Sequence, residues 1–268
     1  MRKSQYGTEL IFLWEGWKSP EQIQLIPTSS TLQINDQLQR KIDTEWEKAK
    51  KANPLAHDAP KWRTERVHDD GAKLLIYVSE IKYSQHNVLR HQQNQQIGFY
   101  PNPITINVVQ ETSDGYIPLG IRGRGSDQEG LCLMGSAFVE RHEKDGVSKD
   151  PEKLGYVVQK KCLEENVYNC RELFDMTDAR AMNVIFGSNH DTTVGFYLPI
   201  FPESNQVSVA SVEHKDILFL SNKLSSIQTV LNNGSYNGIP AADHLLGCLE
   251  SYLVNQRNGN ITPQYQNK

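Results

Sequence analysis

The sequence has little that would tie it to an oxidising or membrane environment. Its four cysteines form no CxxC pair and have no histidines nearby at ligand spacing, so neither a disulfide framework nor a structural zinc site is expected. The apolar run nearest the start, Leu10 to Trp14, is too short for a signal peptide or a membrane span. We therefore expect a cytoplasmic protein that does not enter membranes. The four cysteines are Cys132, Cys162, Cys170 and Cys248.

An excess of basic residues is also missing. The chain carries 28 Lys and Arg against 32 Asp and Glu, a formal net charge of -4, so nucleic acid is not an expected partner. Neither GxGxxG nor GxxxxGK[ST] is present, and the Rossmann and P-loop interpretations therefore lack their main evidence. No motif specifies an oligomeric state.

A glutamine-rich stretch at 91–96 is typical of a surface linker and divides the 268 residues into two parts. We expect an N-terminal α+β extension over 1–94 and a main domain over 95–268. In the extension, helical spacing predicts a helix over 36–51, and the β-rich run over 73–82 predicts a strand. The apolar stripe of that helix, which includes Trp46 as a core residue, should hold the extension against the main domain.

The main domain alternates strand-like and helix-like segments. Strands interrupted by one central helix and finished by another predict an α/β fold of the α+β type, with a mixed sheet between helices. We expect the first two strands to form a hairpin through the Ser113-Asp114-Gly115 turn. The predicted strands are 104–110, 116–122, 131–134, 182–186, 193–200 and 217–220, and the predicted helices are 151–165 and 241–255.

The residues with the clearest chemical potential lie where the central helix ends. Glu164 and Glu165 are adjacent carboxylates that can hold a hard divalent cation, Mg²⁺ or alternatively Mn²⁺. Such a cation offsets the charge of a diphosphate and can activate water for phosphoanhydride cleavage. The ordinary alternative for these two glutamates is a solvated helix end.

The order of residues through this segment resembles the Nudix box, G-x5-E-x7-R-E-U-x-E-E-x-G-U, in which U is aliphatic. The positions that match without a gap are Gly146, Glu152, Glu164 and Glu165. The positions that depart from it are Lys160 for Arg, Lys161 for Glu, Cys162 for the aliphatic residue and Val167 for the final Gly. In a second alignment Gly135-Ser136 opens the box, which makes 137–150 an insertion and the match of Gly146 accidental.

Outside the box the chain is similar to the UDP-glucose diphosphatase-like branch of eukaryotic-type Nudix proteins. The segments that carry this likeness are Trp46, Asn53-Pro54, Lys61-Trp62-Arg63, Tyr83, the strand pair over 183–197 and the loop Ser211-Val212-Glu213. The resemblance implies a Nudix-like α/β/α sandwich. It also implies a small-molecule ligand, a nucleoside diphosphate linked to another group, with a UDP-sugar as the first guess.

The same resemblance implies roles for individual residues. Glu164 and Glu165 would hold the metal, with Glu152 as a further ligand, and Glu213 would supply a base from a loop. Arg122 or Arg124 would orient phosphate through charge-assisted contacts. The ordinary alternatives are a solvent-exposed turn for the two arginines and a surface pair for Glu213-His214.

Lys161 separates the functional hypotheses, because a family member would carry a carboxylate there. Its ammonium can form a salt bridge with Glu165 on the same helical face, which would weaken a metal site, or can bind phosphate itself. The hypotheses are a magnesium-dependent diphosphatase, a non-catalytic module that binds a nucleotide or nucleotide sugar, and an interaction domain with no small-molecule site.

Overall fold

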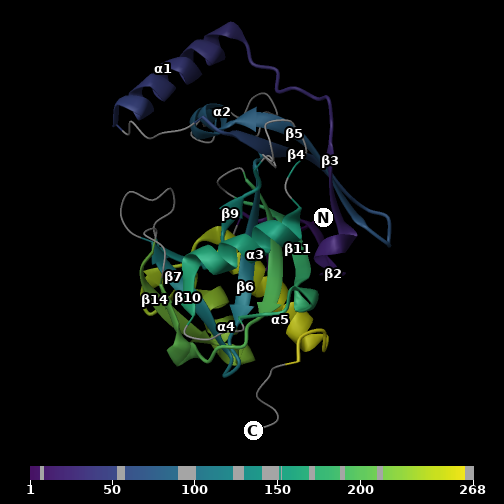
Figure 1. Cartoon of the computed structure of the whole chain (residues 1–268), viewed down its shortest axis with the longest axis vertical. Helices are drawn as coiled ribbons and strands as arrows, with labels where there is room; N and C mark the ends of the chain where they lie inside the picture. The colour runs from purple at the N-terminus through teal and green to yellow at the C-terminus, as the bar shows by residue number, and fades with distance from the viewer. Residues whose placement is uncertain are drawn as a thin grey trace.

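The computed structural model has a six-stranded mixed sheet at its centre, between helices on both faces (Figure 1). The structure describes residues 1–6, 9–52, 58–89, 101–122, 130–140, 151, 153–168, 173–187, 191–209 and 214–262, excluding the side chains of 52, 165–168 and 209. No helix within these ranges is both long and apolar enough to span a membrane.

The order of elements agrees with most of the predicted segments. The helices are α1 (Asp36–Ala52), α2 (Tyr83–Leu89), α3 (Leu154–Glu165), α4 (Leu224–Asn233) and α5 (Asp243–Arg257), with short 3-10 turns η1 (Pro20–Gln22), η2 (Met176–Asp178) and η3 (Ser204–Gln206). The strands before α3 are β1 (Arg2–Lys3), β2 (Ile11–Lys18), β3 (Ile23–Pro27), β4 (Pro60–Asp69), β5 (Leu74–Lys82), β6 (Ile104–Glu111), β7 (Tyr116–Arg122), β8 (Gly130–Leu133) and β9 (Ala137–Phe138). Those after it are β10 (Asn166–Tyr168), β11 (Arg180–Phe186), β12 (Thr192–Pro199), β13 (Val207–Val209), β14 (His214–Ser221), β15 (Ser235–Tyr236) and β16 (Ile239–Pro240).

The central sheet has the strand order β1-β2-β11-β12-β6-β9. β6 and β12 run parallel over eight residue pairs, from Ile104↔Thr192 to Glu111↔Pro199, whereas the other neighbours run antiparallel. Every residue of both parallel strands is buried, as expected for strands covered on both faces. The predicted mixed sheet between helices is therefore confirmed.

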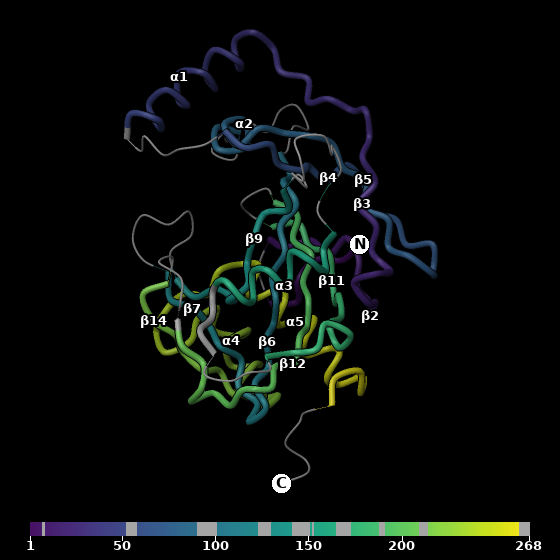
Figure 2. The backbone as a smooth tube through the Cα atoms, viewed as in Figure 1, coloured from purple at the N-terminus to yellow at the C-terminus, as the bar shows by residue number. Residues whose placement is uncertain are grey.

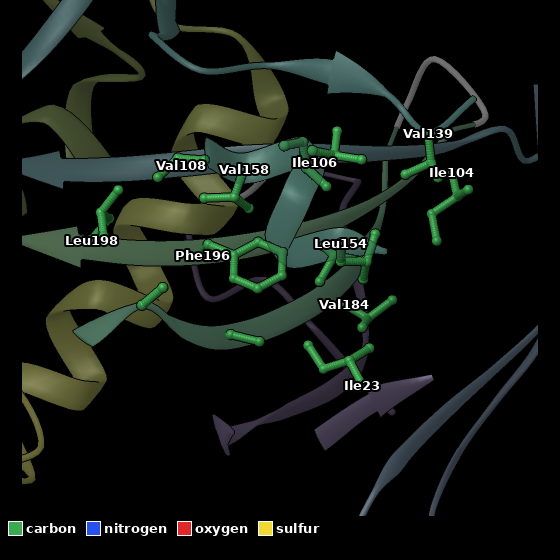
Figure 3. Packing of buried hydrophobic residues seen from close by; sticks show 14 of the residues in the cluster. Ile23, Ile104, Ile106, Val108, Val139, Leu154, Val158, Val184, Phe196 and Leu198 are labelled. Carbon is green, nitrogen blue, oxygen red and sulfur yellow. The ribbon is translucent and has the colours of Figure 1, made fainter. Parts of the chain in front are cut away.

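Alternation along β6 separates the core into two halves. Ile106 and Val108 face α3 and contribute to a core that includes Val158, as Figure 3 shows. Val109 points to the opposite face, where it contributes to a second core with Leu249 of α5. Since successive side chains of a strand point to opposite faces, one strand supplies both layers.

The predicted hairpin between the first two strands of the main domain is wrong. The turn exists, because the Gly115 N–H donates to the Thr112 carbonyl at 2.8 Å. β7 then leaves the central sheet and joins a separate three-stranded sheet of order β14-β7-β8. β6 pairs with β12 along its whole length and with β9 at Thr105 and Ile106, whereas β7 pairs with β14 and β8.

The N-terminal part contributes to two different sheets. β2 pairs with β11 in the central sheet, although the sequence analysis assigned no strand to this segment. β3, β5 and β4 form a three-stranded sheet of their own, which lies above the central sheet with α1 and α2 (Figure 2). The indole N–H of Trp62 donates to the Glu140 carbonyl at 3.2 Å and connects β4 to the residues after β9. The boundary at residue 94 stays a prediction.

Trp46 was expected in the core, but it is only half-buried. Its ring meets Tyr83 of α2 edge-on, with the ring centroids 6.1 Å apart. Ile42, one turn earlier on α1, is 1% exposed. α1 packs against the short helix α2, and Trp46 stays partly exposed to solvent.

A buried polar network lies at the end of β6. The Glu111 carboxylate accepts hydrogen bonds from Asn222 Nδ2 at 2.7 Å and from the Tyr252 hydroxyl at 2.8 Å. Burial raises the pKa of Glu111, and hydrogen bonds from Tyr252, Asn222 and Tyr197 offset this only in part. The network joins β6 and β12 to α5 and to Asn222, the residue after β14.

Candidate functional site

α3 presents the apolar face that its sequence predicts. Leu154, Val157, Val158 and Cys162 are all buried against the central sheet. The opposite face is exposed, with half of Tyr156 accessible to solvent. The helix begins at Leu154 instead of the predicted Pro151 and runs to Glu165, so the adjacent glutamates lie at its C-terminal end.

The first of these glutamates, Glu164, forms an ion pair with Lys161. Lys161 Nζ lies 2.8 Å from Glu164 Oε2, with side-chain exposures of 30% and 45%. Residues three apart on a helix share a face, which places the ammonium beside the carboxylate. The sequence predicted a bridge to Glu165, whose side chain lies outside the described atoms, so that pairing and the metal role of Glu165 stay predictions.

Sequence reasoning missed a second carboxylate, Glu140, near the same helix. Its Oε1 lies 2.6 Å from Nζ of Lys61, a residue of β4 that is 79 positions away in the chain. Burial alone would raise the pKa of Glu140, but the hydrogen bond and charge of Lys61, together with the charges of Lys160 and Lys161, lower it. No spacing in the sequence could have indicated this arrangement, because its members come from separate elements.

Among the described side chains around Glu140 and Glu164, ammonium groups therefore outnumber carboxylates. Three ammonium groups, those of Lys61, Lys160 and Lys161, act on two carboxylates. We call these five residues the lysine cluster. Its two carboxylates are about half exposed, at 50% and 45%, so the cluster opens to solvent on their side.

Arg122 lies in a different setting, at the end of β7 in the three-stranded sheet. It is paired across the sheet with His214 of β14 and Gly130 of β8. Burial and the nearby charge of Arg122 lower the pKa of His244, at the start of α5, to about 3. The arginine is half-buried, which argues against the fully exposed turn that the sequence offered as its alternative.

His214 was expected in a surface pair with Glu213, and for the histidine this is wrong. It is 5% exposed, and its Nδ1 lies 3.8 Å from the Sγ of Cys132. Gly120 makes room for the ring, since a Cβ at that position would lie 2.4 Å from Nδ1. Gly120 therefore allows β7 and β14 to pack closely at this position.

The turn at Gly135 approaches α3 directly. Gly135 has φ +87°, and a Cβ there would lie 3.3 Å from Cys162 Sγ. The Ser136 hydroxyl donates to the Leu133 carbonyl at 3.0 Å and closes the turn. A side chain at Gly135 would therefore crowd Cys162. Gly146 lies outside the described residues, so both alignments of the box stay open.

Three predicted site residues, Arg124, Glu152 and Glu213, also lie outside the described residues, and their roles stay predictions. Among the residues that are described, no group of three or more His, Cys, Asp or Glu side chains could hold a metal ion. The one predicted metal ligand with a described side chain, Glu164, carries the ammonium of Lys161. The predicted magnesium site stays a prediction, because Glu152 and the Glu165 side chain lie outside the described residues.

No family model matches the sequence, and no curated protein is significantly similar to it. Among solved structures, a bifunctional NMN adenylyltransferase/ADP ribose pyrophosphatase from Francisella tularensis is similar with 13% identity and a TM-score of 0.38, over 66% of this chain and 47% of that chain. The Nudix domain of Shewanella oneidensis NrtR, complexed with ADP ribose, has 13% identity and a TM-score of 0.34, over 64% of this chain and 97% of that chain. A MutT protein from Methanosarcina mazei Go1 has 14% identity and a TM-score of 0.34, over 59% of this chain and 95% of that chain. Similarity at this level does not place the chain in a family, and we base no functional conclusion on it.

Proposed function

We propose that this chain is a Nudix-like module that binds a nucleoside diphosphate derivative at the C-terminal end of α3, with little or no hydrolysis. The observation that carries the proposal is the 2.8 Å contact between Lys161 and Glu164. It puts a fixed positive charge where the resembled family presents carboxylates for a metal. A site of this kind keeps affinity for phosphate but loses the group that would activate water.

The layout around α3 supports the Nudix-like part of the proposal. The helix packs on a mixed sheet. The Gly135 turn lies so close to α3 that a Cβ at this glycine would be 3.3 Å from the Sγ of Cys162. These features accompany the partial box found in the sequence, in which Glu164 and Glu165 keep their spacing. The cytoplasmic location is likewise a proposal, from the sequence alone.

The second candidate is the magnesium-dependent diphosphatase, with a UDP-sugar as substrate. Glu164 favours it in one respect, because its side chain is 45% exposed and can rotate away from Lys161 toward a cation. Glu165 would supply the adjacent carboxylate, and Mn²⁺ could replace Mg²⁺. The described residues give no geometry for this metal.

A panel of nucleoside diphosphate derivatives separates the candidates. UDP-glucose and ADP-ribose would each be tested for a rise in melting temperature and for phosphate release after phosphatase coupling, with and without magnesium. A ligand that binds the folded state raises the melting temperature according to its concentration and affinity. Stabilisation without release supports the binding module. Release that requires magnesium supports the diphosphatase, and the absence of both contradicts the two proposals and leaves the interaction domain.

A further inference from the structure

We propose that Lys161 and Lys160, supported by Lys61, bind the diphosphate of the ligand directly and take the place of a divalent cation. The inference rests on the proposed function and specifies how its ligand is recognised. It predicts diphosphate binding that does not require a metal.

The first step is the convergence of the three lysines from two parts of the chain. Lys61 comes from β4 and is 8% exposed, so its ammonium is held in place by surrounding structure and by its 2.6 Å contact with Glu140. Lys160 and Lys161 come from the last turns of α3, and Lys161 is held by Glu164. Both α3 lysines act electrostatically on Glu140, which connects the two ion pairs.

The second step is the charge and donor balance. Among the described side chains, three ammonium groups act on two carboxylates, whereas a metal site needs an excess of negative donors. An ammonium has three N–H donors, so Lys161 can keep Glu164 and still donate to a phosphate oxygen. A lysine ammonium is a compact point charge that suits phosphate.

The third step is access. Lys161 is 30% exposed, so an anion can reach its ammonium from solvent, while the half-exposed carboxylates of Glu140 and Glu164 oppose its approach. The same ammonium groups repel Mg²⁺ at close range. The cluster therefore favours the anionic ligand over the cation.

The experiment is isothermal titration of the full chain with UDP-glucose and, separately, with inorganic pyrophosphate, each in EDTA and in magnesium. We expect both probes to bind in EDTA. Lys161→Met removes the charge and keeps the length of the side chain, and should weaken binding in EDTA by about ten- to a hundredfold, the loss of one charge-assisted hydrogen bond. Lys153→Met is the matched control, because Lys153 is an exposed lysine just before the other end of α3, and its binding should match the wild type.

A second variant tests the charge balance in the opposite direction. Glu140→Gln removes an anion that competes for the lysines, so it should tighten pyrophosphate binding, a gain that a merely structural role would not produce. Binding that disappears in EDTA and returns with magnesium would overturn the inference, as would Lys161→Met binding as well as Lys153→Met. If pyrophosphate binds in EDTA through Lys161 but UDP-glucose binds in neither buffer, the lysine cluster stands and the proposed function is wrong. If no probe binds in either buffer, both are wrong.

Discussion

Lys161 Nζ and Glu164 Oε2 lie 2.8 Å apart, one turn of α3 from each other, at the place where the resembled box has carboxylates. The pair is local to one helix and exposed on one side, so it adds little to stability. Its effect is on the character of the site. A carboxylate that already has an ammonium partner is a weaker ligand for a divalent cation.

Lys161→Glu should strengthen magnesium binding, because it removes the ammonium and adds a carboxylate beside Glu164. Lys161→Ala should strengthen it less, since it removes the charge without adding a ligand. Magnesium titration by calorimetry on the wild type and the two variants measures the order. Any phosphoanhydride hydrolysis should increase in the same order, as a phosphate-release assay would show. Brisk hydrolysis by the wild type that Lys161→Glu abolishes would contradict the picture of a weakened metal site.

Glu164→Ala and Glu165→Ala should change ligand or metal binding without a clear change in melting temperature. The Glu164 side chain is 45% exposed, so its removal leaves no cavity and no buried unpaired group. Thermal unfolding of both variants beside the wild type measures this. Val158→Ala is a suitable contrast on the same helix, since Val158 is fully buried and its truncation should lower the melting temperature. If both glutamate variants bind pyrophosphate and magnesium as the wild type does, the site assignment is wrong.

The buried carboxyl of Glu111 should make stability fall as pH rises. Burial raises the pKa of Glu111 in the folded state above its ordinary value of 4.5, so the folded state keeps a proton that the unfolded state has released. The free energy of unfolding should therefore decrease from about pH 4.5 upward until the folded pKa is passed, by at most about 1.4 kcal/mol per pH unit for this one proton.

Glu111→Gln is the matched variant, because it keeps the shape of the side chain and cannot ionise. Urea unfolding at several pH values should show that wild-type stability declines relative to the variant over this range. Parallel curves for the two proteins would mean that Glu111 does not titrate as inferred. Tyr252→Phe removes the hydroxyl that donates to the Glu111 carboxylate at 2.8 Å, and should shift the declining range to higher pH.

Asn183→Leu should destabilise the fold although it puts an apolar side chain in a buried position. Asn183 Nδ2 donates to Ser251 Oγ at 2.8 Å, and its Oδ1 accepts from the Gly195 N–H at 3.1 Å. Leucine leaves these groups without this partner in the interior, at an expected cost of about 2 to 4 kcal/mol in the free energy of unfolding. Asn232→Leu on the exposed face of α4 is the control and should stay within about 0.5 kcal/mol of the wild type.

A fragment of residues 95–268 should not fold stably, because it lacks β2. Phe12 of β2 is 1% exposed and pairs with Ile185 of β11, so without it the central sheet has an open edge beside an uncovered core. Circular dichroism of the fragment and limited proteolysis of the full chain test this. Release of a stable, ligand-binding 95–268 piece would contradict it. In the full chain Phe12→Ala should cost about 3 to 5 kcal/mol.

Much of the secondary structure was determined by the sequence itself. The segments predicted as β5, β6, β7, α3 and α5 were found within a few residues of their predicted limits. These elements have a strong local pattern, since the spacing of apolar residues along a few turns or along one strand is enough to specify them. A pairing between Lys161 and a glutamate of the same helix could be predicted for the same reason, although the sequence analysis named Glu165 and the observed partner is Glu164.

Contacts between residues far apart in the chain could be known only from the tertiary structure. β6 and β7 adjoin in sequence but belong to different sheets, because β6 pairs with β9 and β12 whereas β7 pairs with β8 and β14. Lys61 reaches Glu140 across 79 positions, and its ammonium acts on that carboxylate together with Lys160 and Lys161 of α3. The spacing of residues along one segment cannot specify such contacts. They depend on which faces of separate elements pack together and on the charges that this packing brings close to one another.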